Sequence, residues 1–158
     1  MPIDSGELIQ RYGLIPHPEG GWYRELHRSP LLVQRADGRH RSALTAILFL
    51  LQAGEISRWH RVAAADETWH FAGGDPLELF SINEPDGRLQ RQLLAGPTEA
   101  AAVPLAVVAS ACWQAARTTG AWSLVSCCVG PGFDFADFTL LRDCPREQWP
   151  PAATEDFL

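Results

Sequence analysis

The chain has 158 residues, of which 46% are hydrophobic and 20% charged, and this composition is typical of one globular domain, 1–158, with a sizeable core. Its formal net charge of −6 argues against a nucleic-acid or anionic-membrane surface, because both need a basic patch. All 13 basic residues are arginine, so chemistry that uses a lysine Schiff base or a lysine general base is excluded. Any acid or base must therefore be His, Glu, Asp, Tyr or Cys.

The first predicted element is a short helix over residues 4–12. Asp4 is a helix N-cap residue with Glu7 as its capping partner, and Gly13 provides the stop. The segment "IPHPEGGW" that follows predicts a turn, since its prolines and glycines cannot continue a helix. The N-terminus lacks the basic and apolar regions of a signal peptide, and no apolar run is long enough to span a bilayer. We therefore expect a cytoplasmic protein with four reduced, mostly core-filling cysteines.

After this turn the sequence predicts short strands separated by glycine- and proline-rich turns. The absence of helical periods between them favours an all-β sandwich or barrel, and a last helical turn is expected within 144–151. The predicted strands are 22–27, 43–52, 57–62, 67–72, 77–83, 89–94, 103–108, 111–117, 121–129 and 134–141.

Two neighbouring strands, 57–62 and 67–72, carry the main candidate site. If they pair as a hairpin over residues 63–66, strand alternation turns His60 and Glu67 toward the same interior. A buried polar pair needs mutual or ligand satisfaction, so both are candidate catalytic residues. The same alternation turns His70 outward, toward a surface or a partner chain.

Other strand residues complete a predicted small-molecule pocket. Residues 22–25 have two faces, and alternation does not decide which one lines the pocket. The stretch "PGFDFADF" is expected to be a strand with Phe133 and Phe135 inward, where it closes the barrel and packs into the core. The alternative is that Asp134 or Asp137 pairs with an arginine such as Arg24 or Arg117. The candidate ligand-binding residues are Tyr23, Glu25, Arg58, Trp69, Phe71, Gln114, Phe133 and Phe135.

The spacing around His60 resembles the first motif of the cupins, in which a glycine, two histidines, a glutamate and a second glycine recur at fixed intervals. Gly54, His60, Glu67 and Gly74 match it, but Val62 stands where the second histidine belongs. The second motif falls on 109–114, where its anchors have changed and Gln114 takes the place of a histidine. A metal is therefore disfavoured, because His60, Glu67 and Gln114 form a weak reduced ligand set; the cofactor is left unknown.

Four further segments resemble a small single-domain cupin-like family of unknown function found in bacteria and fungi. They are "HPEGGWYRE" (17–25), "WHRV…DETWHFAGGDPLEL" (59–79), "WQAAR" (113–117) and "VGPGFDFADFTLL" (129–141). The resemblance implies a cupin-type jelly-roll β-barrel, a deep pocket in the barrel mouth and a homodimer. The resemblance does not imply a particular reaction, because proteins of one fold can have unrelated functions.

Three functions remain open at this point. The first is a metal-independent isomerase, epimerase or dehydratase that acts on a sugar- or nucleotide-like molecule with His60 and Glu67. The second is a non-catalytic protein that binds a small polar molecule. The third is a metal-dependent enzyme with the reduced ligand set.

Overall fold

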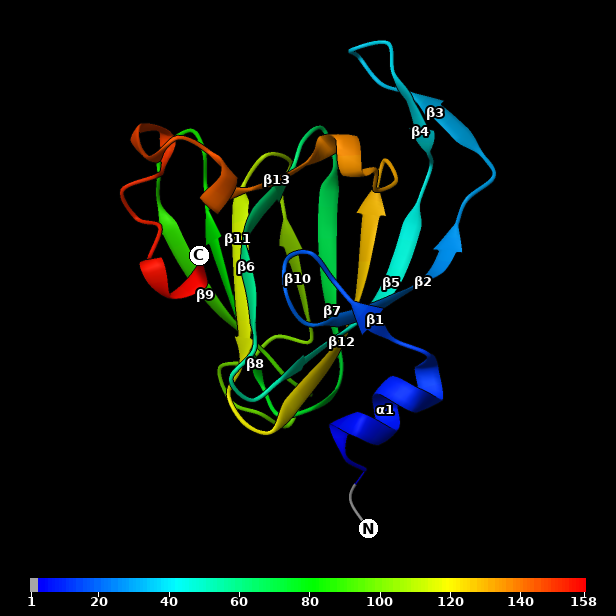
Figure 1. The fold of residues 1–158 in the computed structure, drawn as a ribbon, viewed down its shortest axis with the longest axis vertical. Helices are drawn as coiled ribbons and strands as arrows, with labels where there is room; N and C mark the ends of the chain where they lie inside the picture. The colour runs from blue at the N-terminus through cyan, green and yellow to red at the C-terminus, as the bar shows by residue number, and fades with distance from the viewer. Residues whose placement is uncertain (1–2) are drawn as a thin grey trace.

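The computed structural model describes residues 3–158 as two antiparallel sheets that face one another, with a short helix at the N-terminus (Figure 1). The predicted all-β, cupin-type jelly-roll fold is thereby confirmed. The six-stranded sheet has the order β1 (Ile15–Pro16), β2 (Trp22–Arg28), β5 (Thr45–Gln52), β12 (Trp122–Gly130), β7 (Asp66–Gly74) and β10 (Leu105–Val108). The five-stranded sheet has the order β13 (Phe138–Leu140), β6 (Ile56–Val62), β11 (Trp113–Thr118), β8 (Leu77–Ile82) and β9 (Leu89–Leu94).

Helix α1 (Ser5–Tyr12) has the predicted caps at both ends. The Asp4 carboxylate accepts the backbone N–H of Glu7 at 2.8 Å, and the Glu7 side chain accepts the N–H of Asp4 at 3.1 Å. Gly13 ends the helix in the left-handed conformation with φ of 61°. The helix packs its buried Leu8 against Leu50 on the outer face of the six-stranded sheet. No helix within residues 3–158 is long and apolar enough to cross a membrane.

The main core lies between the two sheets, at the closed end of the barrel. Strand alternation points Phe49, Trp69 and Val125 of one sheet toward Leu79 of the other, and all four side chains are buried. A second apolar cluster lies outside the five-stranded sheet, where η4 (Glu155–Phe157) packs Phe157 against Trp59. These two clusters hold the strands of the candidate site rigidly in place.

The predicted hairpin between 57–62 and 67–72 is wrong. β6 pairs with β11 and β13 in the five-stranded sheet, whereas β7 pairs with β10 and β12 in the other sheet. Residues 63–65 cross from one sheet to the other, with Ala64 in the left-handed region at φ of 55°. His60 and Glu67 still share an interior, but they enter it from opposite walls.

The predicted strand 134–141 is only partly correct. The Asp134 carboxylate accepts the N–H of Ala136 at 2.8 Å and caps the 3₁₀ turn η1 (Phe135–Asp137), so that only β13 is extended. The short strands β1, β3 (Leu32–Gln34) and β4 (His40–Ser42) were not predicted. Two other 3₁₀ turns, η2 (Leu141–Asp143) and η3 (Arg146–Gln148), follow β13, and η3 confirms the expected late turn.

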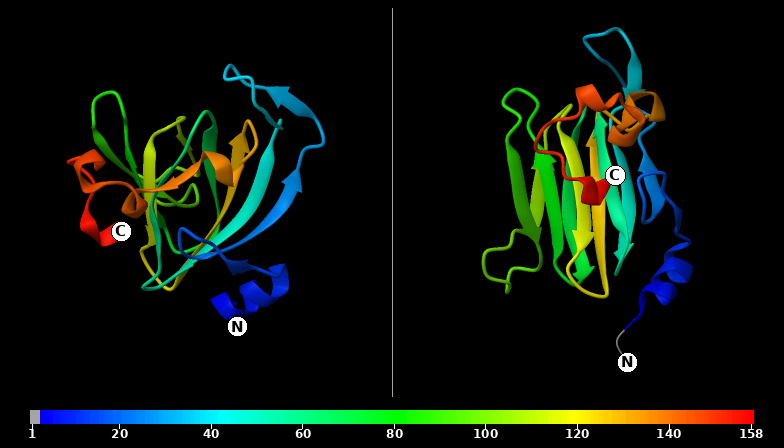
Figure 2. Two further views of the ribbon diagram at one scale, coloured as in Figure 1. Left: turned by 45° about the horizontal axis from the view of Figure 1, so that its top comes forward. Right: turned by 60° about the vertical axis from the view of Figure 1, so that its left-hand side comes forward.

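The hairpin of β3 and β4 projects beyond the barrel in both views of Figure 2. Asp137 of η1 ties it down, since this carboxylate accepts from Arg35 at 2.8 Å and from Arg41 at 2.8 and 3.0 Å. Asp137 therefore pairs with arginines, as the alternative interpretation of this segment predicted, but the suggested partners Arg24 and Arg117 are wrong. Arg24 instead donates to the carbonyl of Tyr12, and Arg117 pairs with Glu78.

Candidate functional site

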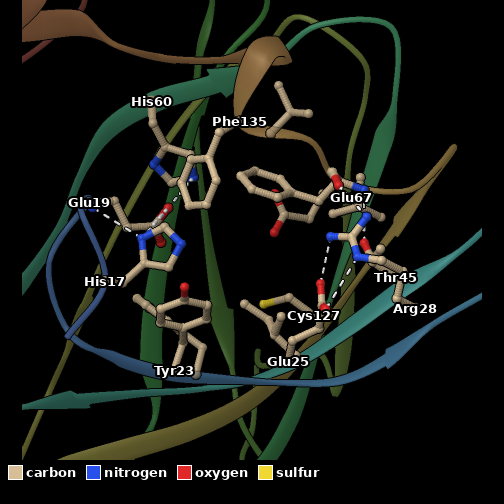
Figure 3. A pocket seen from close by; sticks show the side chains of 15 residues that line it. His17, Glu19, Tyr23, Glu25, Arg28, Thr45, His60, Glu67, Cys127 and Phe135 are labelled. Atoms are coloured by element: carbon tan, nitrogen blue, oxygen red, sulfur yellow. Dashed lines mark hydrogen bonds and ion pairs between the residues drawn. The ribbon is translucent and has the colours of Figure 1, made fainter. Parts of the chain in front are cut away.

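A cavity of about 270 Å³ opens between the two sheets at the end of the barrel near η1. Strands of both sheets, the loop 17–21 and the segment before β13 supply its walls (Figure 3). The lining residues are His17, Glu19, Tyr23, Glu25, Arg28, Thr45, Ile47, Phe49, His60, Val62, Glu67, Cys127, Val129, Phe133 and Phe135. A concave, mostly apolar site with a few convergent polar groups is the usual form of a small-molecule site.

Glu67 enters the cavity from the six-stranded sheet and is held by a chain of two hydrogen bonds. The Trp69 indole N–H donates to Gln114 Oε1 at 2.8 Å, and Gln114 Nε2 donates to Glu67 Oε2 at 2.5 Å. Because an indole N–H can only donate, the orientation of the Gln114 amide is fixed. The pKa of Glu67 is raised to about 7, chiefly by burial and also by the charge of Glu19, against the opposing effects of His60 and the hydrogen bond from Gln114.

His60 enters from the five-stranded sheet, and both of its ring nitrogens are engaged. Nδ1 lies 2.6 Å from the carbonyl oxygen of Arg58, and Nε2 lies 3.0 Å from Glu19 Oε2. Burial lowers the pKa of His60, whereas the charge of Glu67 and the Arg58 carbonyl oppose this shift. Figure 3 shows His17, Glu19 and His60 together on one side of the cavity, with Glu67 on the other.

Glu19 is almost fully buried, with 6% of its surface exposed. Ser57 Oγ donates to its Oε1 at 2.9 Å. Burial raises the pKa of Glu19 to about 8, against the opposing hydrogen bond from Ser57. The cavity therefore has two carboxyl groups, one from each wall, whose pKa values both lie near neutrality.

His17 completes the polar group on the loop side. Its Nδ1 accepts the backbone N–H of Glu19 at 3.1 Å, so the neutral ring carries its proton on Nε2. Burial lowers the pKa of His17 to about 3, with a further contribution from His60. The ring packs edge-on against Tyr23 at a centroid distance of 4.5 Å. His17 is thus a neutral hydrogen-bond donor at physiological pH.

Glycines allow the loop 17–21 to enter the barrel. Gly20 has φ of 107°, and a Cβ at this position would lie 2.0 Å from the carbonyl oxygen of Ile56. This close approach places the Glu19 carbonyl where it accepts the N–H of Arg58 at 2.7 Å. The loop is thereby attached to the edge of β6 beside His60.

An ion pair and two aromatic rings form the rim of the cavity. Arg28 donates to both carboxylate oxygens of Glu25 at 3.3 and 2.6 Å, and to the carbonyl oxygen of Phe133 at 3.0 Å. Phe133 and Phe135 pack edge-to-face at 4.9 Å, and Phe135 is 53% exposed. Deeper in the cavity, burial raises the pKa of the Cys127 thiol well above its ordinary value, so it is a neutral wall group.

The structure brings six of the predicted site residues together around this cavity: His60, Glu67, Tyr23, Glu25, Phe133 and Phe135. Tyr23 and Glu25, and not Trp22 and Arg24, are the face of β2 that lines it. Their functional roles stay predictions.

Four predicted ligand-binding residues lie outside the lining. Trp69 and Gln114 stand behind Glu67 as its supports, and Phe71 packs against the main core. Arg58 is covered by the loop 17–21, with Nη1 3.4 Å from the Glu19 carbonyl oxygen. His70 lies on the other face of β7, where its Nε2 is 3.1 Å from Thr68 Oγ1.

Sequence reasoning missed several lining residues, of which His17 and Glu19 matter most. Both lie in a segment that was predicted only as a turn. The pair Gly20–Gly21 was the available signal, because adjacent glycines indicate a close backbone approach. Arg28, Thr45 and Cys127 carried no comparable signal.

The side chains around the cavity do not fit a metal ion. Among residues 3–158, no group of three or more His, Cys, Asp or Glu has a geometry that could hold one. The only ligand atom of Gln114, its oxygen, accepts from Trp69, and both nitrogens of His60 are engaged. The reduced set of His60, Glu67 and Gln114 therefore offers few free donor atoms to a metal.

Comparisons with known proteins agree with this fold. The family model Cupin_5, described as "Cupin superfamily (DUF985)", matches residues 6–141. A hypothetical protein from Leishmania major is 33% identical, with a TM-score of 0.80 over 87% of this chain and 86% of its own. A protein from Shewanella oneidensis is 34% identical, with a TM-score of 0.80 over 89% and 85%.

A more distant structure shares the fold alone. The capsular polysaccharide assembling protein CapF from Staphylococcus aureus is 11% identical, with a TM-score of 0.61 over 81% of this chain and 31% of its own. No curated protein matches the sequence.

Proposed function

We propose that this chain, which belongs to the Cupin_5 (DUF985) family of the cupin superfamily, binds a small polar molecule in the barrel. We further propose that it transfers protons to and from this molecule without a metal. The reaction class is isomerisation, epimerisation or dehydration next to a carbonyl group. The observation that carries the proposal is a pair of acid–base groups, Glu67 and the Glu19–His60 pair, which enter one cavity from opposite walls.

The pKa values suit this chemistry. A general acid or base works best when its pKa lies near the working pH, because both protonation states are then accessible. Burial has raised the pKa of Glu67 to about 7, so this carboxyl both accepts and donates a proton at neutral pH. Its fixed hydrogen bond from Gln114 keeps one oxygen in place and leaves the other for a ligand.

The cavity favours a small and uncharged ligand. A volume of about 270 Å³ lies at the lower end of small-molecule sites, which suits a molecule of roughly monosaccharide size. The neutral His17 provides no positive charge, and Arg28 is already paired with Glu25. Aromatic rings and hydrogen-bonding groups together suit a hydroxylated carbonyl compound.

Hydrogen exchange tests this function even while the product is unidentified. The protein is incubated in D₂O with a panel of neutral hydroxylated aldehydes, ketones and lactones of monosaccharide size or smaller. We expect deuterium to enter a C–H position next to the carbonyl of at least one compound. Glu67→Gln should slow this exchange by about 10²- to 10⁴-fold, the usual contribution of a general acid–base group.

Glu99→Gln is the matched control, because Glu99 is exposed and lies outside the cavity lining. It should exchange at the wild-type rate. Exchange by Glu67→Gln at the wild-type rate would contradict the proposal.

A non-catalytic binding protein is the second candidate, and the same cavity supports it. In that case a compound from the panel stabilises the protein against heat but is recovered without deuterium. Wild-type protein that binds such a compound and exchanges nothing would replace the first proposal with this one.

A further inference from the structure

His60 has no ring nitrogen free for a ligand. A backbone carbonyl can only accept, so the 2.6 Å contact with Arg58 requires a proton on Nδ1. Nε2 faces Glu19 Oε2 at 3.0 Å. A bound molecule can contact the ring of His60 in the cavity wall, but it exchanges protons with His60 only through Glu19 or by displacing it.

The contact between His60 Nε2 and Glu19 Oε2 contains one proton. Two bare lone pairs at this distance would repel each other, and two protons would collide. In this buried place the neutral arrangement, with a carboxylic acid that donates to a neutral imidazole, avoids a buried charge. Ser57 donates to the other oxygen, Oε1, and leaves the proton on Oε2.

The position of Glu19 argues against a purely structural role. It is a buried carboxyl group in the cavity wall, although a hydrophobic residue of similar size would cost less to bury. Gly20 at positive φ and the bond from Arg58 N–H to the Glu19 carbonyl hold it there. The loop is thus built to present this side chain to both His60 and the cavity.

We propose that Glu19 is a catalytic residue that contacts the substrate, and that His60 is the positioning residue behind it which receives its proton. This inference rests on the proposed function and specifies one half of its site.

The proton transfer balances within the residues described. The substrate C–H bond breaks, its electron pair stays on the substrate as an enolate, and the proton goes to Glu19. The proton already on Glu19 Oε2 moves at the same time to His60 Nε2, so Glu19 stays neutral and His60 becomes an imidazolium. The Arg58 carbonyl, which accepts from Nδ1, stabilises that cation.

Glu67 completes the cycle from the other wall. In its protonated form it gives a proton to the enolate and becomes a carboxylate, which faces the imidazolium across the cavity. After the product leaves, the proton on His60 Nε2 returns to Glu19 Oε2, and the proton that Glu19 took from the substrate passes from its other oxygen through water to Glu67. His17 Nε2–H is available as the donor to the enolate oxygen.

Glu19→Gln separates this inference from the alternative in which His60 contacts the substrate and Glu19 only orients it. The glutamine amide still donates to Nε2, so it preserves orientation, but it cannot pass on a proton. We expect the deuterium-exchange kcat to fall by about 10²-fold or more with KM changed less than about threefold. Glu19→Asp, which retains a carboxyl group, should recover part of this loss.

A loss of kcat below about tenfold in Glu19→Gln would overturn the inference and leave the proposed function in place. Absence of exchange in the wild type would instead overturn the proposed function.

A second measurement needs neither substrate nor a folded Glu19 variant. Protein labelled with ¹⁵N in its histidine rings is examined by NMR at pH 7, and the signals of His60 are assigned by their loss in His60→Asn. We expect a neutral ring with its proton on Nδ1 and a hydrogen-bonded Nε2. An imidazolium or an Nε2-protonated ring overturns the inference, because such a ring has no lone pair to receive the proton from Glu19.

Discussion

The two carboxyl groups of the cavity are held in different ways. Glu67 belongs to β7, a strand paired on both sides, and the side chains of Gln114 and Trp69 fix its carboxyl group. Glu19 belongs to the loop 17–21, and its own backbone carbonyl, which accepts the N–H of Arg58, brings it to His60, while Ser57 donates to its carboxyl group.

One carboxyl group on a strand and another on a loop can thus have similar pKa values, about 7 for Glu67 and about 8 for Glu19. Burial is the largest cause of the raised pKa on both sides, although one carboxyl group is carried by a paired strand and the other by a loop. Each group also accepts one hydrogen bond from a buried side chain, Gln114 for Glu67 and Ser57 for Glu19. The position of the Glu67 carboxyl group should depend mainly on the side chains that contact it. The position of the Glu19 carboxyl group should depend mainly on the backbone conformation of the loop 17–21.

Gly20→Ala should cause the largest loss of stability, because it disturbs the backbone conformation of the loop that carries Glu19. The added Cβ would meet the Ile56 carbonyl oxygen, and positive φ adds its own strain. We expect a loss of at least about 3 kcal/mol in the free energy of unfolding, measured by urea denaturation.

Gly38→Ala is the matched control, since Gly38 also has positive φ, of 83°, but nothing lies within 4 Å of the added Cβ. It should cost only about 1 kcal/mol, the strain of the left-handed backbone alone. Equal losses in the two variants would show that the close approach at Gly20 contributes nothing.

Gln114→Leu tests the strand side by removing a side-chain support. It leaves the Trp69 N–H and a Glu67 oxygen buried without partners, and we expect a loss of about 2 kcal/mol in the free energy of unfolding. The pKa of Glu67 should also rise above its present value of about 7, because the lost bond favours the carboxylate.

The exposed Gln90 of β9 provides the comparison, and Gln90→Leu should change the free energy of unfolding by less than about 0.5 kcal/mol. An unchanged titration of Glu67 in Gln114→Leu, followed by NMR of the carboxyl carbon, would show that Gln114 does not tune this group.

The strand side of the site was predictable from the sequence, and the loop side was not. Period-two alternation turns His60 and Glu67 inward whichever strands they pair with. The prediction that both face the interior is therefore correct, although the predicted hairpin is wrong. Alternation has no equivalent for a loop, where each residue points as local dihedral angles and tertiary contacts dictate. Strand alternation therefore does not identify Glu19, although the adjacent Gly20 and Gly21 mark a position where the backbone approaches its neighbours closely.

The same limit explains the other errors. Asp134 forms a hydrogen bond to its own backbone and starts a 3₁₀ turn, which competes with the strand that the aromatic alternation predicts. Gln114 was placed in the cavity because its motif position is a ligand position in cupins. The indole of Trp69, whose role no spacing rule specifies, turns the amide into a support for Glu67.

The dependence of stability on pH should show the smallest difference between the two sides. Each raised carboxyl pKa means that the folded protein keeps a proton which the unfolded chain loses above about pH 4.5. The free energy of unfolding contributed by each group therefore falls as pH rises, by about 1.4 kcal/mol per pH unit. This fall ends near pH 7 for Glu67 and near pH 8 for Glu19.

Glutamine variants isolate the two contributions, because glutamine does not titrate. His17 and His60, whose pKa values are lowered, act in the opposite direction below pH 6.5, and they are present in every protein compared. Relative to the wild type, Glu67→Gln should gain stability up to about pH 7 and no further. Glu19→Gln should go on gaining up to about pH 8. Urea denaturation at half-unit intervals from pH 4.5 to 8.5 measures the pH range over which each variant gains stability. Identical ranges would mean that Glu19 and Glu67 have the same pKa in the folded protein.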